Sequence, residues 1–129
     1  MGTRSLTFVY GDDNLPLVCM YGQYDGYPSG HGAQLADILA GREIVNGFGS
    51  QTPQKTSNGM GCLAATIIAE FKTGIGNYYI YPADTDDAGQ DYEYHIYSKN
   101  YIMVKDHGQG EIFTGSWCEF ADWCKIDEE

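Results

Sequence analysis

Residues 21–32 combine tyrosine rings, glycines and hydrogen-bonding side chains in one dense cluster. Tyrosine rings offer faces on which a base or a sugar can stack, and amide, carboxyl, hydroxyl and imidazole groups supply donors and acceptors for its polar edges. The cluster therefore indicates a pocket for a small anionic or nucleotide-like ligand, in a protein that binds the ligand without transforming it. The predicted ligand-binding residues are Tyr21, Gln23, Tyr24, Asp25, Tyr27, Ser29 and His31.

The glycines of this cluster have two interpretations. If they lead from a strand into a helix, their backbone amides could point toward an anion at the helix start. The known phosphate-binding patterns are incomplete, however, because no third glycine follows Gly30-x-Gly32 and no Gly-Lys-Ser/Thr run is present. The alternative is structural: the glycines form a tight strand-to-helix turn, Ser29 caps the helix and the tyrosines pack on the sheet.

Catalysis would require a nucleophile, a base and an orienting group in one place. The chain has three histidines, His31, His95 and His107. Ser29 lies two residues from His31, but nothing in the sequence places a third member beside this pair. We therefore predict no catalytic residue, and a hydrolase that depends on His31 remains an alternative to the binding protein.

The acidic run from Asp84 to Asp91 has spacing similar to that of a calcium-binding loop. In that register position five is Ala88 and position twelve is His95, where oxygen ligands are required. An acidic hairpin tip is the better interpretation. The four cysteines contain no Cys-x-x-Cys pair, so we expect free thiols and neither a metal ion nor a cofactor.

The formal net charge of −11 limits the partners of the chain. It repels polyanions, which argues against direct binding of nucleic acid. It favours another alternative, an acidic inhibitor or nucleic-acid mimic that binds a basic host protein through the acidic surfaces around residues 84–93 and 119–129. No apolar run approaches the roughly 20 residues that cross a bilayer, and no signal peptide is present, so the expected location is the cytoplasm.

The elements that would position these residues follow from hydrophobic periodicity and turn residues. Residues 42–58 lack a sustained period and are expected to form a surface loop, after which Ser57 or Asn58 caps a helix. The predicted strands cover residues 5–10, 15–21, 77–82, 91–97, 100–105 and 111–114, and the predicted helices cover residues 31–40, 60–71 and a closing segment that starts with a capping box from Ser116 to Glu119.

The resulting order, ββααββββα, predicts an α+β fold in which an antiparallel sheet of about six strands carries two or three short helices on one face. A chain of 129 residues fits a single domain that covers residues 1–129. The short turns between the last four strands imply antiparallel neighbours. Exposed tyrosines on one side of such a sheet would make a homodimer plausible.

Several stretches of the chain are distinctive as motifs: Met1-Gly-Thr-Arg-Ser-Leu-Thr7, Tyr21-Gly-Gln-Tyr-Asp-Gly-Tyr-Pro-Ser-Gly30, Tyr79-Ile-Tyr-Pro82 and Tyr92-Glu-Tyr94. Together they resemble a family of small uncharacterised proteins found in bacteriophage genomes and in some fungi. The resemblance implies an accessory protein that acts in the cytosol of a bacterial host, where it binds a host protein or sequesters a small signalling molecule. It implies no activity, cofactor or catalytic residue.

Overall fold

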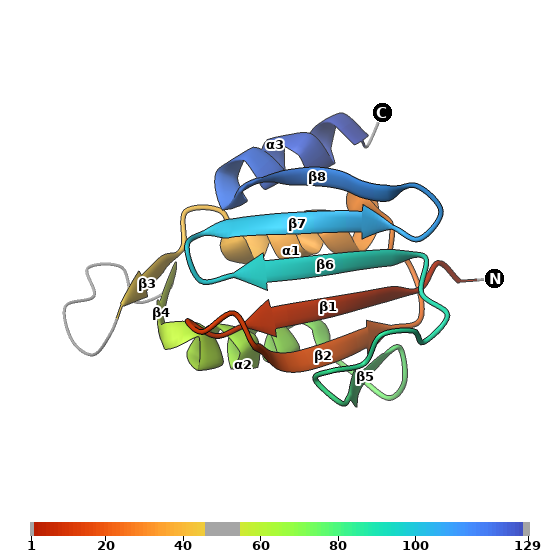
Figure 1. The fold of residues 1–129 in the computed structure, drawn as a ribbon, viewed down its shortest axis with the longest axis horizontal. Helices are drawn as coiled ribbons and strands as arrows, with labels where there is room; N and C mark the ends of the chain where they lie inside the picture. Colours follow the sequence, from red (N-terminus) through yellow and green to blue (C-terminus); the bar gives the residue numbers. More distant parts are fainter. Residues whose placement is uncertain (1, 46–54, 128–129) are drawn as a thin grey trace.

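The computed structural model describes residues 2–45 and 55–127, which form a six-stranded sheet with helices on one face and a small two-stranded sheet beside it (Figure 1). The predicted α+β class and the six strands of the main sheet are confirmed. Across the main sheet the strands lie in the order β5 (Tyr78–Tyr81), β2 (Pro16–Gly22), β1 (Ser5–Tyr10), β6 (Tyr92–Tyr97), β7 (Tyr101–Asp106) and β8 (Gly110–Ser116).

The main sheet is mixed, which corrects the prediction of an antiparallel sheet. β1 and β6 are parallel neighbours, whereas every other pair in this sheet is antiparallel. The cause is a crossover: the chain leaves β5 at the sheet edge, and residues 82–91 lead to β6 in the middle instead of turning back beside β5. The acidic segment is therefore not a hairpin tip. We call residues 82–91 the crossover loop.

Three α-helices cover one face of the sheet, as predicted (Figure 1). A π-helical turn, η1 (Pro28–Gly32), leads into α1 (Ala33–Leu39), and α2 (Gly59–Phe71) and α3 (Trp117–Asp127) follow later in the chain. The capping box at the start of α3 is confirmed, since the Ser116 and Glu119 side chains each accept a hydrogen bond from the other residue's backbone amide. The predicted side-chain cap of α2 is wrong, because Asn58 occupies the N-cap position and no side chain makes a cap hydrogen bond there.

Residues 42–58 contain more regular structure than the expected surface loop. Two short strands, β3 (Glu43–Val45) and β4 (Thr56–Asn58), pair in parallel. The middle of this predicted loop lies outside the described residues. The two strands sit at the end of α1 and the start of α2, so they connect the helices that form the groove described below.

The main core lies between the sheet and the three helices. It includes Val9 and Met20 from the sheet and the fully buried aromatic residues Tyr94, Trp117 and Phe120. The other face of the sheet, the open face, carries a smaller buried cluster of Leu6, Phe8 and Cys19, against which Ala88 of the crossover loop packs.

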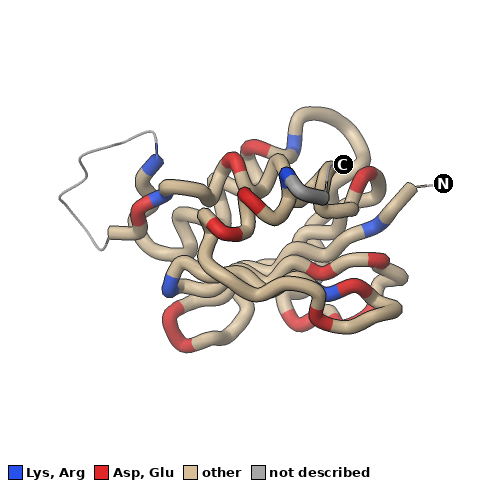
Figure 2. Tube along the Cα trace, turned by 90° about the horizontal axis from the view of Figure 1, so that it is seen from above, with Lys and Arg blue, Asp and Glu red and all other residues tan. Residues whose placement is uncertain are grey.

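The distribution of charged residues and the state of the cysteines agree with the acidic, thiol-containing chain expected from the sequence. Carboxylates are spread over both the helical layer and the loops of the sheet, with few basic residues between them (Figure 2). None of the four cysteines forms a disulfide bond, which agrees with the expected thiols. Within residues 2–45 and 55–127, no group of three or more His, Cys, Asp or Glu residues is arranged to hold a metal ion, and no helix is long and apolar enough to cross a membrane.

Candidate functional site

Residues 21–32 form a tightly hydrogen-bonded turn between β2 and α1. Asp25 adopts a left-handed conformation with φ of 57°, and its carbonyl accepts a 2.7 Å hydrogen bond from the His31 amide. The amides of Gly30 and Gly32 both donate to the Tyr27 carbonyl. Since these helix-start amides are already bonded inside the turn, they are not available to cradle a phosphate.

The glycines of the turn are explained by close packing. A Cβ atom on Gly26 would lie 2.9 Å from the Thr3 carbonyl oxygen, and one on Gly32 would lie 3.2 Å from Sγ of Cys124. The Tyr94 hydroxyl also donates a 2.7 Å hydrogen bond to the Gly26 carbonyl. The structural interpretation of the glycines therefore holds, except that Ser29 does not cap the helix: the residue before η1 is Tyr27, and no side chain makes a cap hydrogen bond there.

The seven residues predicted to bind a ligand are not gathered around one cavity. Tyr21 lies on the open face, where its ring stacks on Tyr81 at 5.0 Å, whereas His31 is in the core. Tyr24 and Asp25 are exposed and line a hollow beside the turn. The remaining three are partly or largely exposed on the turn and line none of the hollows described below: Gln23, Tyr27 and Ser29.

His31 lies in the core and contacts Phe71 and Tyr78, two residues that line the hollow beside the turn. Its Nε2 atom lies 2.7 Å from Oγ1 of Thr7, its Nδ1 atom lies 3.3 Å from the Tyr78 hydroxyl, and its ring packs on Phe71 at 4.5 Å. Burial lowers the pKa of His31 to about 3 and, with a smaller contribution from Asp25, raises the pKa of Tyr78 to about 12. The imidazole is therefore neutral and too deeply enclosed to act as a base on a ligand.

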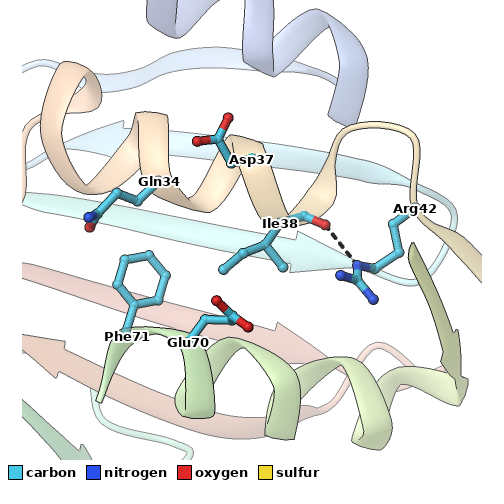
Figure 3. A pocket seen from close by; sticks show the side chains of 6 residues that line it. All are labelled: Gln34, Asp37, Ile38, Arg42, Glu70 and Phe71. Atoms are coloured by element: carbon cyan, nitrogen blue, oxygen red, sulfur yellow. Dashed lines mark hydrogen bonds between the residues drawn. The ribbon is translucent and has the colours of Figure 1, made fainter. Parts of the chain in front are cut away.

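A polar groove runs between α1 and α2 (Figure 3). Its larger hollow has a volume of about 330 Å³ and a neighbouring hollow about 200 Å³, and both are lined by Gln34, Glu70 and Phe71. We call the two together the α1–α2 groove. The larger hollow is completed by Asp37, Ile38 and Arg42, and the smaller by Tyr24, Asp25, Thr73, Asn77 and Tyr78.

The charges of the α1–α2 groove are predominantly negative. Glu70 lines both hollows, Asp25 lines the smaller one and Asp37 lines the larger one. In the part of the chain that the structure describes, the Glu70 carboxylate forms no ion pair and no side-chain hydrogen bond, whereas Asp37 interacts electrostatically with Lys55, whose ammonium donates to the Asp37 carbonyl. Arg42, by contrast, is only 8% exposed and is hydrogen-bonded within the protein. Its Nε donates to the Ile38 carbonyl at 2.7 Å and its Nη1 to Oγ of Ser57 at 3.1 Å.

The open face carries a hydrogen-bonded chain of three side chains that the sequence analysis missed. The Tyr10 hydroxyl lies 2.7 Å from Nδ1 of His95, and Nε2 of His95 lies 2.9 Å from Oε1 of Glu93. Gln90 donates to the other Glu93 oxygen at 2.8 Å. We call Tyr10, His95 and Glu93 the open-face array.

Protonation in the open-face array follows from these contacts. The hydrogen bond from His95 lowers the pKa of Glu93, which is therefore a carboxylate and requires a proton on Nε2 of His95. Nδ1 is then the acceptor for the Tyr10 hydroxyl. Burial, together with the adjacent Tyr97, raises the pKa of Tyr10, so this hydroxyl is protonated at rest.

Ring stacking holds the array rigidly against the sheet. Phe8 stacks on His95 with centroids 4.8 Å apart and an interplanar angle of 8°, and Tyr10 stacks on Tyr97 at 4.5 Å. A hollow of about 270 Å³ opens between the array and the crossover loop. Besides the array it is lined by Phe8, Pro16, Ala83, Asp84, Thr85, Asp86 and Lys105.

One sequence signal for this array was present. Glu93 and His95 alternate on a strand, so they had to lie on one face. The partner Tyr10 could not be assigned, because its neighbourhood depends on the parallel pairing of β1 with β6.

Comparison of the chain with models of known families, with curated proteins and with solved structures gave no match. The function is therefore inferred from the geometry of the groove and its charges.

Proposed function

We propose that the chain is a binding protein whose α1–α2 groove holds a small, extended organic cation with two or more ammonium or guanidinium groups. The observation that carries this proposal is the Glu70 carboxylate, which has no ion pair among the described residues and lines both hollows of the groove. Asp25 adds negative charge to the smaller hollow and Asp37 adds it to the larger one.

The number of cationic groups follows from energetics. Glu70 and Asp37 are exposed, and an exposed ion pair contributes at most about 1 kcal/mol. A ligand with a single ammonium group would gain little, whereas a linear ligand that meets several carboxylates along the groove adds such contributions. The net charge of −11 also favours the approach of cations over anions.

An anionic or nucleotide-like ligand is the competing hypothesis. Tyr24, with its exposed ring, and Gln34 and Asn77, with amide groups, could contact a base in the smaller hollow. The phosphate of such a ligand would find few donors, because the backbone amides of the turn and the Arg42 side chain already form hydrogen bonds within the protein. Whichever ligand is bound, the resemblance to bacteriophage proteins supports a role of the protein in the cytosol of a bacterial host.

A thermal-shift series tests the choice, because a ligand that binds only the folded state raises the melting temperature. The probes are putrescine, spermidine and arginine amide, compared with mono-, di- and cyclic nucleotides, all at matched ionic strength. We expect spermidine to stabilise the protein more than putrescine does, and nucleotides to have no effect.

Variants of the groove complete the test. Glu70→Gln should weaken spermidine binding about fivefold, as expected for the loss of one exposed ion pair. Asp122→Asn is the matched control, because it removes one carboxylate from the exposed surface of α3. Equal effects of the two substitutions would reduce the binding to a general charge effect, and stabilisation by a nucleotide would favour the competing hypothesis.

A further inference from the structure

The open-face array has the composition and contacts of a reactive centre. We propose that it forms a second site, in which the Tyr10 hydroxyl accepts an acyl group from a small uncharged or cationic ester and passes it to water. The hydroxyl oxygen, the imidazole and the Glu93 carboxylate are in hydrogen-bond contact at 2.7 and 2.9 Å, the arrangement of nucleophile, base and orienting group. This site is independent of the α1–α2 groove, which lies on the helical side of the sheet.

The charge of the hollow above the array limits the substrate. Asp84, Asp86 and Glu93 line it together with the single cation Lys105, so an anionic substrate is disfavoured. Phe8 contributes apolar surface to the same hollow. A volume of about 270 Å³ admits a small ester and excludes a polymer from the hollow itself.

Because burial makes the Tyr10 hydroxyl difficult to deprotonate, acyl transfer requires a base in contact with it, and the array supplies that base. Because Glu93 holds the proton of His95 on Nε2, the lone pair of Nδ1 faces the Tyr10 hydroxyl. Glu93 is a positioning residue, since it fixes the orientation of the imidazole and stabilises its protonated form. Lys105 lies opposite Glu93 in the register of β6 and β7, and it brings positive charge to the hollow, where an oxyanion would develop.

The reaction has two balanced steps. In the first, the Tyr10 oxygen attacks the ester carbonyl carbon while its proton passes to Nδ1 of His95, and the alcohol then leaves with that proton. Tyr10 now carries the acyl group as an aryl ester. In the second, His95 removes a proton from water, the resulting hydroxide attacks the acyl carbon, and the carboxylic acid is released as Tyr10 regains its proton.

Acetylation by p-nitrophenyl acetate tests the nucleophile. We expect a burst of p-nitrophenolate and one acetyl group on Tyr10, located by peptide mass analysis. Tyr10→Phe keeps the stacked ring and should abolish both. His95→Gln should slow acetylation about a hundredfold, the lower range for loss of a general base.

Two further variants separate chemistry from folding and from unspecific acetylation. Glu93→Gln, which removes the charge of a positioning residue, should lower kcat with little change in KM. His107→Gln is the control, because it removes an exposed histidine outside the array and should leave the rate unchanged.

Acetyl groups on Lys105 or spread over several tyrosines, or an unaltered rate in His95→Gln, would overturn the proposal. Spermidine stabilisation of the same variants reports on the groove alone, so failure of one site is distinguishable from failure of the other.

Discussion

His31 and Thr7 are joined by a 2.7 Å hydrogen bond between Nε2 and Oγ1, and each side chain is only 1% exposed. This bond ties the turn of residues 21–32 to β1 in the centre of the sheet. The second ring nitrogen contacts the Tyr78 hydroxyl on β5, at the sheet edge. A histidine from the most distinctive motif of the sequence therefore fastens that motif to two strands.

Replacing this histidine should destabilise the fold strongly. His31→Ala removes a buried ring from its contact with Phe71 and leaves Thr7 without this hydrogen bond. The free energy of unfolding should fall by about 3 kcal/mol, the range for a large-to-small substitution in a core. Urea unfolding at neutral pH measures the change, with the exposed His107→Ala as the control. A loss below about 0.5 kcal/mol, as is usual for surface positions, would contradict the structural role of His31.

Acid should weaken the fold through the same residue. The pKa of His31 is about 3 in the folded chain and 6.5 in its ordinary state, so the unfolded chain binds the proton first as pH falls. The contribution of His31 is fully present above pH 6.5 and is lost progressively between pH 6.5 and pH 3. At about 1.4 kcal/mol per pH unit, the total loss amounts to at most about 5 kcal/mol. Urea midpoints at pH 7, 5.5 and 4.5 should fall more steeply for the natural chain than for His31→Gln, and parallel slopes would speak against the assignment.

Much of the fold was predictable because its signals are local. The hairpin of β1 and β2 follows from a cluster of turn residues in which Asn14 adopts a positive φ of 62°, and the start of α3 follows from its capping box. The parallel pairing of β1 with β6 was not predictable in this way. It depends on contacts between residues more than 80 positions apart in sequence, and the acidic crossover loop between β5 and β6 resembles an ordinary turn.

The candidate sites were less predictable than the fold. The motif of residues 21–32 combines glycines needed for packing with exposed Tyr24 and Asp25, and sequence alone does not separate the two groups. Glu70 carries the proposed groove, yet in sequence it is one carboxylate on the surface of an amphipathic helix. Tyr10 and His95 come together only through the strand order.

Two glycines should respond to alanine in opposite directions. Gly26→Ala places a methyl group 2.9 Å from Thr3 O and from Ser5 Cβ, and relieving this overlap should cost about 2 kcal/mol. Gly61→Ala meets no atom within 4 Å and lies in α2, where alanine should stabilise the helix by about 0.5 to 1 kcal/mol. Thermal unfolding of both variants measures the difference. Destabilisation by Gly61→Ala, or a neutral Gly26→Ala, would be inconsistent with the described packing.

Arg42 distinguishes a cationic ligand from an anionic one. Arg42→Gln removes the positive charge at one end of the α1–α2 groove, along with hydrogen bonds to the Ile38 carbonyl and Ser57. The loss of these buried hydrogen bonds should lower the free energy of unfolding by about 1 to 3 kcal/mol. Spermidine affinity should nevertheless increase a fewfold, because the repulsion between Arg42 and the ligand disappears.

Urea unfolding measures the change in stability, and calorimetric titration at low salt measures the affinity for spermidine. Arg4→Gln, at an exposed arginine outside the groove, is the control for net charge. Weaker spermidine binding in Arg42→Gln than in Arg4→Gln would contradict the predicted repulsion, because spermidine has no anionic group that Arg42 could contact.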